Sequence, residues 1–405
     1  MRYHANLAYG GLVPPAEKLL PSSQRRLNLV VMRFCLTSTQ ADWGGGERLL
    51  WSIRTALLVR GHHVSWIVRR DQPLHRLVVA EGDDVVATPE RRGVNPREWF
   101  EVRHGLRQWA PDVLLLNDSH AIMLGGSAAL ACSPVRPLRL AIRHVVFRLR
   151  SPLKLRLMSD AVICVSEAAR RSLLAAGIPR ERTEVIYGGC APPTLDPLAR
   201  QWAEGELGIT PTAPLLVCVG NLLECKGHVP LVEAAALVHA QMPDAHIVIA
   251  GEGVLRERLQ RRIEELGLNS CVHLLGFRND ADRWISAASV VLHPSLQEGL
   301  SLVLIQAQML GKLIVSTGVG GSAEVLGLDE DLPCLAWLAT PGDPTTLAEQ
   351  IKLATDAWRL GPAAYAIPLE RAASRARLKF DIDRNVGELI ELAHRLRQPK
   401  RKSLV

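Results

Sequence analysis

The residues best suited to chemistry lie where an apolar run gives way to a glycine and then to a helix. Residues 293–308 have the sequence HPSLQEGLSLVLIQAQ and follow the apolar run 288–292. They place Glu298 and Gly299 between the end of an expected strand and a helix expected from about Ser301. A helix N-terminus offers free N–H groups and the positive end of the helix dipole. The stretch therefore predicts an anion-binding site with one carboxylate beside it.

A lysine occupies a second turn of the same kind. Lys226 lies in residues 220–228 (GNLLECKGH), between an expected strand at 214–219 and an expected helix at 231–242. A lysine in a glycine-flanked loop between a strand and a helix can bind phosphate. The Gly-Lys-Ser/Thr of a Walker loop is missing. This loop alone leaves an ordinary surface lysine as the alternative.

Two further glycine-bearing turns follow strands in the second half of the chain. Gly251 to Gly253 comes after an expected strand at 246–250, and residues 318–324 (GVGGSAE) come after one at 313–316. In a parallel sheet all four turns lie on the carboxyl edge, where α/β proteins bind ligands. Together they predict a nucleotide-type pocket, in which Lys226 and a helix N-terminus bind phosphate and Glu298 binds a hydroxylated group.

The first half contains a triple glycine in the same kind of position. Residues 42–48 (DWGGGER) join a first strand, expected near 28–35, to a helix expected at 49–59. Glycines here let a ligand approach the backbone closely and leave helix N–H groups free. A flexible turn is the alternative, and the dinucleotide fingerprint Gly-x-Gly-x-x-Gly is absent.

Polar residues follow two strands expected in the first half. Asn117, Asp118 and His120 come after an apolar strand at 112–116, and His144 comes after one at 138–142. Such strand ends line the ligand crevice of a parallel sheet, so Asp118 and His120 are candidates for a base or for sugar contacts. His144 is a candidate for binding or proton transfer. The alternatives are a helix N-cap by Asp118 or Ser119 and a structural role for His144.

Length and patterning indicate how these residues are positioned. A chain of 405 residues is too long for one ordinary core, and its 48% apolar and 22% charged content is that of a soluble globular protein. Strand-like and helix-like segments alternate almost throughout, which predicts an α/β fold with parallel sheets and helices on both faces. Residues 188–197 (GGCAPPTLDP) predict a linker between two domains.

Cysteines and terminal segments limit the location of the protein. The eight cysteines include no Cys-x-x-Cys, so we expect reduced, buried thiols, a cytosolic protein and no metal site. Residues 1–24 lack the apolar core of a signal peptide. The longest uncharged run, 121–135, is short for a membrane span and is broken by glycine and proline. We therefore expect no transmembrane segment.

Charge is distributed unevenly along the chain. Residues 1–200 carry 28 Lys and Arg against 17 Asp and Glu, whereas the remainder carries 20 against 24. The segment 136–156 has no acidic residue and interleaves apolar side chains with Arg136, Arg139, Arg143, Arg148, Arg150, Lys154 and Arg156. This pattern is typical of a basic amphipathic segment on an anionic membrane surface. A solvated helix face is the alternative, and the lack of a nucleic-acid motif argues against DNA or RNA.

Taken together, the motifs resemble those of a retaining glycosyltransferase of the GT-B fold, most similar to glycosyltransferase family 4. The resemblance extends from Asn28 to about Leu396. Five places carry it: Gly44-Gly45-Gly46-Glu47, the segment 160–167 (DAVICVSE), the segment 220–227 (GNLLECKG), the segment 294–308 (PSLQEGLSLVLIQAQ), and Gly320-Gly321-x-x-Glu324. The order and spacing of the last three are the most specific part of the match.

The resemblance implies two Rossmann-like α/β/α domains that face each other across a cleft. It assigns residues 1–25 to an extension, 26–190 to an acceptor domain, 191–380 to a nucleotide-sugar domain, and 381–405 to a helix that returns to the first domain and a basic tail. It implies no cofactor and no metal. The expected substrates are a nucleotide-sugar and a glycan or lipid-linked acceptor, and the expected location is the cytoplasm or the inner face of the cytoplasmic membrane.

The resemblance also assigns roles to single residues. It places Glu298, His144 and Lys226 in catalysis, with Glu298 holding the hydroxyls of the donor sugar. Asn117, Asp118 and His120 are expected to contact the acceptor or the sugar. Donor binding is assigned to Gly45, Gly46, Gly220, Asn221, Lys226, Gly251, Gly253, Glu298, Gly299, Leu300, Ser301, Leu302, Val303 and Gln306.

Three positions depart from the family pattern. Asn221 replaces an arginine at the diphosphate, Gln306 replaces a glutamate that usually accepts hydrogen bonds from the ribose, and Gly188-Gly189 replaces Asn-Gly. Loss of the charge at Gln306 is expected to weaken donor binding by about 1–2 kcal/mol. Two alternatives stay open: a catalytically weak binding or scaffold protein that retains the fold, and a nucleotide-sugar epimerase.

Overall fold

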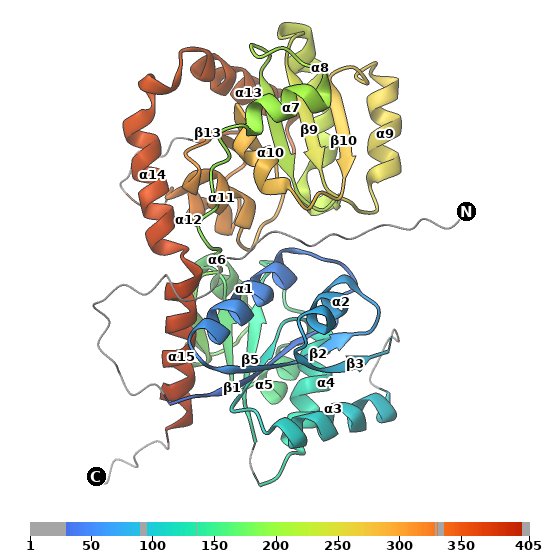
Figure 1. Cartoon of the computed structure of the whole chain (residues 1–405), viewed down its shortest axis with the longest axis vertical. Coiled ribbons are helices and arrows are strands. Elements are labelled where there is room, and N and C mark those ends of the chain that lie inside the picture. Colours follow the sequence, from blue (N-terminus) through green and yellow to red (C-terminus); the bar gives the residue numbers. More distant parts are fainter. Residues whose placement is uncertain (1–29, 90–94, 135, 329, 331–335, 399–405) are drawn as a thin grey trace.

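The computed structural model describes residues 30–89, 95–134, 136–328, 330 and 336–398. The expected extension 1–25 and the basic residues 400–402 lie outside the described residues. Two α/β domains, each with a parallel sheet covered by helices on both faces, stand one above the other (Figure 1). The prediction of two α/β domains with parallel sheets is therefore confirmed.

The first domain contains a seven-stranded sheet in the order β3-β2-β1-β4-β5-β6-β7. Its central strands are apolar on both faces; all four residues of β4, Val113–Leu116, are buried. Such strands need helices on both sides of the sheet. The strands are β1 Arg33–Ser38, β2 His63–Arg69, β3 Asp84–Thr88, β4 Val113–Leu116, β5 Leu138–Arg143, β6 Ala161–Cys164 and β7 Thr183–Val185. The helices are α1 Gly45–Val59, α2 Pro73–Ala80, α3 Pro96–Trp109, α4 Ser119–Leu130, α5 Pro152–Met158 and α6 Glu167–Leu174.

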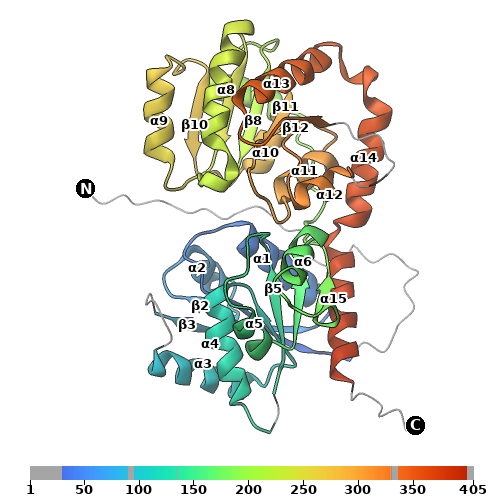
Figure 2. The ribbon, with the colours of Figure 1, turned by 180° about the vertical axis from the view of Figure 1, so that it is seen from behind.

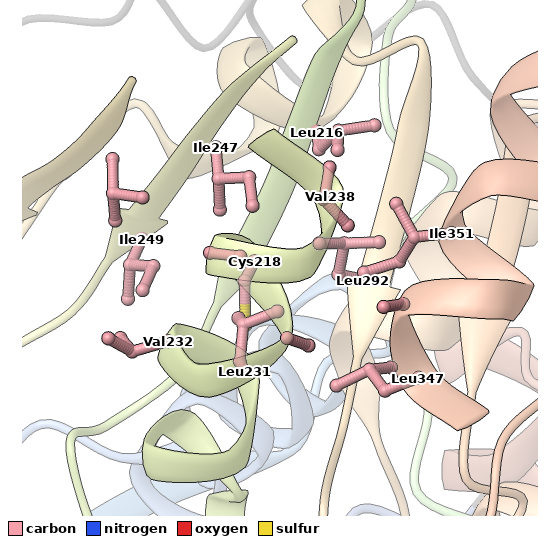
Figure 3. Close-up of a cluster of buried hydrophobic side chains, with 14 of the residues drawn as sticks. Leu216, Cys218, Leu231, Val232, Val238, Ile247, Ile249, Leu292, Leu347 and Ile351 are labelled. Atoms are coloured by element: carbon pink, nitrogen blue, oxygen red, sulfur yellow. The ribbon is translucent and has the colours of Figure 1, made fainter. Parts of the chain in front are cut away.

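The second domain contains a six-stranded sheet in the order β10-β9-β8-β11-β12-β13. The strands are β8 Leu215–Val219, β9 His246–Ala250, β10 Val272–Gly276, β11 Val290–His293, β12 Leu313–Ser316 and β13 Ala336–Leu338. The helices are α7 Ala199–Leu207, α8 His228–Gln241, α9 Arg256–Glu265, α10 Ala281–Ala287, α11 Leu302–Met309, α12 Gly321–Leu326 and α13 Pro344–Arg359. On one face of this sheet, Leu216, Ile247 and Leu292 pack against α8 and α13 (Figure 3).

The last two helices connect the domains. Helix α14, Ala366–Lys379, lies on the second domain, and α15, Ile382–Arg397, packs against α1 of the first (Figures 1 and 2). The returning helix was expected to begin after residue 380, and Phe380 itself is fully buried in the core of the second domain. Asp381 then caps α15 by accepting a hydrogen bond from the N–H of Arg384 at 2.9 Å. This cap separates the two helices.

The basic segment 136–156 differs from the expected single amphipathic segment. It contains strand β5, a loop and the start of α5. Arg139 is buried and forms an ion pair with Asp160 at 2.6 Å, because β5 is an inner strand whose side chains point into the domain. Arg143 donates a hydrogen bond to the carbonyl of Phe147, and Lys154 donates to the carbonyl of Ser119. Arg139, Arg143 and Lys154 therefore make contacts that stabilise the first domain.

Two expectations about thiols and membranes can be compared with the described residues. Seven cysteines fall within them and all are free thiols, six of them buried. The helices of the described part are too short or too polar to traverse a bilayer. The same residues contain no group of three or more His, Cys, Asp or Glu side chains arranged to hold a metal ion.

Candidate active site between the two domains

Glu298 is a buried carboxylate in the loop between β11 and α11. Its Oε2 accepts hydrogen bonds from Lys226 Nζ at 2.6 Å, His293 Nε2 at 3.2 Å and Ser295 Oγ at 3.3 Å. The side chain is 8% exposed. Burial acts to raise the pKa of Glu298, but the charge of Lys226 and the hydrogen bond from His293 outweigh it and lower the pKa to about 2. The carboxylate is therefore ionised at neutral pH.

The N-terminus of α11 lies directly after this carboxylate. Ser301 caps the helix by accepting a hydrogen bond from the N–H of Leu304 at 3.2 Å. The N–H groups of Leu302 and Val303 have no partner among the described residues. Free N–H groups, the helix dipole and the ammonium of Lys226 make this end of the sheet suited to an anion such as a phosphate.

A second polar network lies on the first domain. Glu47 is buried and accepts hydrogen bonds from Ser38 Oγ at 2.9 Å and from Asn117 Nδ2 at 3.2 Å. Asn117 Oδ1 lies 2.5 Å from His144 Nε2. Burial raises the pKa of Glu47, and the hydrogen bond from Ser38 opposes this. Burial lowers the pKa of His144 to about 4, so its imidazole is neutral at pH 7.

The glycine-rich turn of the first domain is shaped by this network. Glu47 Oε2 accepts a hydrogen bond from the N–H of Gly44 at 3.2 Å, which folds the turn back onto α1. A Cβ at Gly46 would lie 3.2 Å from Asn117 Nδ2 and 3.7 Å from His144 Nε2. A side chain at position 46 would therefore press on both groups.

The two sides of the site come together at the loop that contains Gly299. A Cβ at Gly299 would overlap the carbonyl oxygen of His144, so the main chains of the two domains touch there. A Cβ at Gly44 would lie 3.6 Å from Asn221 Nδ2, which brings the two glycine-bearing turns face to face. The structure therefore gathers residues predicted from both halves of the chain into one junction.

Two motif residues make hydrogen bonds across this junction. Ser166 Oγ donates to the carbonyl of Gly299 at 2.6 Å. The carboxylate of Glu324 accepts from the N–H groups of Glu167 at 2.8 Å and Ala168 at 2.7 Å. Sequence reasoning did not assign these contacts. The sequence features that could have indicated these contacts are a serine at a helix start and the Gly-Gly-x-x-Glu motif. Neither feature identifies the residue with which it forms a hydrogen bond.

Several predicted site residues have structural partners. Asp118 caps α4, accepting from the N–H groups of His120 and Ala121 at 2.9 Å, and it also binds Thr39. The N-cap alternative for Asp118 therefore describes its contacts. His120 lies in the first turn of α4. Leu300 packs across the junction, 2.9 Å from where a Cβ of Gly188 would be.

Most of the predicted glycines of the second domain are required by loop packing. A Cβ at Gly251 would overlap the carbonyl of Gly220, and one at Gly253 would lie 2.5 Å from the carbonyl oxygen of Leu222. Gly227 has φ +71° and lies against Pro294, which packs the Lys226 turn on the Glu298 loop. By contrast, a Cβ at Gly45 would meet nothing within 4 Å.

Gln306 has an acidic partner that the sequence did not indicate. Its Nε2 donates to Asp282 Oδ1 at 2.9 Å. Burial raises the pKa of Asp282, while Arg48 of the first domain and Gln306 oppose this. A carboxylate is therefore present beside position 306, but it belongs to Asp282 of α10. No local sequence pattern links the two positions.

Two protein-family models match the sequence of this chain. Residues 43–192 match the family model described as Glycosyltransferase Family 4, and residues 213–356 match the one described as Glycosyl transferases group 1. A Vi polysaccharide biosynthesis protein of Salmonella typhi is 30% identical over 145 residues, which is 35% of this chain and 25% of that protein. An amylovoran biosynthesis glycosyltransferase of Erwinia amylovora is 26% identical over 249 residues, covering 59% of this chain and 57% of that protein.

Solved structures extend the similarity to the whole fold. Anabaena HepE, crystallised with UDP and glucose, has a TM-score of 0.76 and 21% identity, and covers 90% of this chain and 99% of its own. The matched stretches span about a quarter to three-fifths of the two curated relatives. The two family models, which lie one on each domain and together cover most of the chain, and the shared fold show that the chain belongs to the glycosyltransferase family 4 group with the GT-B fold.

Proposed function

We propose that this protein transfers a sugar from a nucleotide-sugar to a hydroxyl acceptor with retention of anomeric configuration. The observation that carries the proposal is the ionised Glu298, which is paired with Lys226, precedes the free N–H groups of Leu302 and Val303, and is followed by Gly299, whose main chain touches that of His144 in the first domain. This place combines positive charge, which a diphosphate requires, with a hydrogen-bond acceptor, which sugar hydroxyls require.

The groups of the site divide these tasks. Lys226 and the N–H groups of Leu302 and Val303 stabilise the negative charge that develops on the departing diphosphate. Glu298 accepts hydrogen bonds from the donor sugar at the reacting centre. His144 is neutral, so it can donate or accept one hydrogen bond without adding charge. The turn of Gly45 and Gly46 gives the donor access to the backbone of the first domain.

The proposed setting is the synthesis of a cell-envelope polysaccharide or glycolipid. Relatives named for Vi polysaccharide and amylovoran biosynthesis support it, as does a structural neighbour crystallised with UDP-glucose. In this setting the acceptor is a glycan or a lipid-linked sugar bound at the carboxyl edge of the first sheet, near Asn117 and His120.

A donor screen tests the proposal. Purified protein is incubated with UDP-, GDP- and ADP-sugars; binding is followed by calorimetry, and transfer or hydrolysis by mass spectrometry. We expect one donor class to bind, NMR of the product to show the donor's anomeric configuration, and Glu298→Gln to abolish transfer. Binding of no nucleotide-sugar would favour a scaffold protein, and a changed sugar without acceptor would favour an epimerase.

We also propose that the first domain contacts an anionic membrane surface through the loop after β5 and through α5. The exposed side chains there are apolar at Phe147, Leu153 and Leu157, with exposed fractions of 44%, 64% and 54%. Exposed arginines accompany them at Arg148, Arg150 and Arg156. Leu153 and Leu157 are four residues apart on one face of α5, an arrangement suited to lipid.

Vesicle sedimentation tests this contact. We expect wild-type protein to bind phosphatidylglycerol vesicles and to release them at high salt, and the double variant Leu153→Glu and Leu157→Glu to stay in solution. Leu360→Glu, which changes an exposed leucine on the second domain, is the matched control. Equal binding by the double variant and the control, or no wild-type binding, would contradict the contact.

A further inference from the structure

Helix α6 of the first domain begins with N–H groups that its own chain satisfies only in part. The first N–H groups of an α-helix have no partner within the helix. Ser166 accepts from the N–H of Ala169 at 3.0 Å, which leaves those of Glu167 and Ala168. Glu324 of the second domain accepts from both, one through each carboxylate oxygen. The cap of α6 is therefore shared between the domains.

The contact between α6 and the second domain also includes the main chain of the loop that carries Glu298. Ser166 Oγ donates to the carbonyl of Gly299, the residue after Glu298. From the other side, the N–H of Gly321 donates to the carbonyl of Glu298 at 3.0 Å. A Cβ at Gly320 or at Gly321 would overlap the carbonyls of Glu298 or Gly299. The catalytic loop is thus held between α12, which carries Glu324, and the start of α6.

The charge of Glu324 is balanced mainly by the first domain. The carboxylate is buried and lies at the positive end of the α6 dipole. Among the described residues, the cation that pairs with this carboxylate is Arg171 of α6, whose Nη2 lies 4.0 Å from Glu324 Oε1 and whose side chain is largely exposed. If the domains separated, Glu324 would lose both N–H donors and Gly299 would lose Ser166. The closed arrangement is therefore the one that satisfies these groups.

We propose that Ser166 and Glu324 form an interdomain latch that holds the two domains closed and fixes Glu298 against the first domain. Both are positioning residues, because neither contacts the proposed reacting centre. Figures 1 and 2 both show α6 at the junction, next to α12. The link to turnover rests on the proposed glycosyl transfer, whereas the link to domain arrangement does not.

The first test measures domain arrangement without substrate. Small-angle scattering compares the wild type with Glu324→Ala, Glu324→Gln and Ser166→Ala. Glu167→Ala is the control, since Glu167 stands at the same helix start but its side chain pairs only with Arg170 among the described residues. We expect a larger radius of gyration for Glu324→Ala, a smaller increase for Glu324→Gln and Ser166→Ala, and none for the control.

The second test measures turnover with the donor identified by the screen. We expect kcat to fall at least about tenfold in Glu324→Ala with the affinity for the nucleoside diphosphate nearly unchanged, and Glu324→Gln to recover part of it. Circular dichroism and melting show whether each variant is folded, and Glu324→Gln and Ser166→Ala decide the result if Glu324→Ala is not.

Unchanged scattering in the folded latch variants, or an equal change in the control, would overturn the latch. If Glu324→Ala opens the domains but the wild type turns over no donor, the latch stands and the proposed function is refuted.

Discussion

Replacement of Lys226 by methionine is expected to destabilise the protein in a pH-dependent way. Methionine retains most of the alkyl stem but removes the ammonium that lies 2.6 Å from Glu298 Oε2. The carboxylate stays buried with His293 and Ser295 as its remaining partners. Removal of one member of a buried ion pair is costly because the other charge is left unpaired.

Two contributions set the size of the loss in folding free energy. The pKa of Glu298 is about 2 against an ordinary value of 4.5, which corresponds to about 3 kcal/mol of linked stability at neutral pH. Breaking a buried pair typically costs about 3–5 kcal/mol. Lys226 is 28% exposed and two hydrogen bonds to Glu298 remain, so water screens part of the loss. We expect a loss of about 2–3 kcal/mol at pH 7.5.

The sign of the pH dependence distinguishes this cause from lost packing. In the wild type the lowered pKa of Glu298 contributes stability above pH 4.5 that is lost as the pH falls toward 2. In the variant the ammonium no longer lowers the pKa of Glu298, so this pKa moves up toward its ordinary value and protonation relieves the penalty at a higher pH than in the wild type. The difference in stability between wild type and variant should therefore stay nearly constant down to about pH 4.5 and shrink to roughly half at about pH 3.

Urea unfolding at pH 7.5 and at about pH 3 provides the measurement. Arg258→Met is the control, because Arg258 pairs with Glu224 at 2.9 Å with side chains 57% and 67% exposed. Exposed pairs contribute at most about 1 kcal/mol. The reasoning is refuted if the loss in Lys226→Met is equal at both pH values, or no larger than in the control.

Three further predictions concern the junction. Gly299→Ala should abolish turnover in a folded protein, because its Cβ would overlap the carbonyl of His144; Gly205→Ala, with open space around it, should retain activity. Gln306→Glu should cost about 1 kcal/mol in urea unfolding, because it sets a carboxylate against Asp282, and Asp282→Asn in the same chain should remove the cost. NMR should find the ring of His144 neutral at pH 6, with a pKa near 4. Because the unfolded chain binds this proton at a higher pH than the folded protein does, the stability linked to His144 is lost as the pH falls below 6.5. Titration of the ring near 6.5 would contradict its burial.

The fold and the positions of the main site residues could be predicted because they depend on local patterns. Alternating apolar strands and helices imply parallel sheets, and a parallel sheet places every strand-to-helix turn on one edge. This rule brings Lys226 and Glu298 together although 72 residues separate them. The N-cap alternative for Asp118 was also local, since the cap lies within three residues.

The remaining features depend on contacts that no local pattern encodes. The basic segment 136–156 has the composition of one amphipathic surface, but β5 turns Arg139 inward to a partner at Asp160. Glycine turns predict close approach without naming what approaches. At Gly251 and Gly299 the approaching group is another stretch of backbone. The partner of Gln306 lies on another helix.

Glu298 and Glu324, which are both buried in the second domain, differ in which groups compensate their charge, and this difference separates their roles. Glu298 is balanced by Lys226, His293 and Ser295, all within its own domain, so it stays ionised whether or not the domains meet. Glu324 is balanced by N–H groups of the first domain and has those donors only when the domains meet. A charge that is always compensated suits binding a substrate in either arrangement. A charge that has its N–H donors in only one arrangement biases the protein toward that arrangement, because the open state leaves Glu324 without both of them.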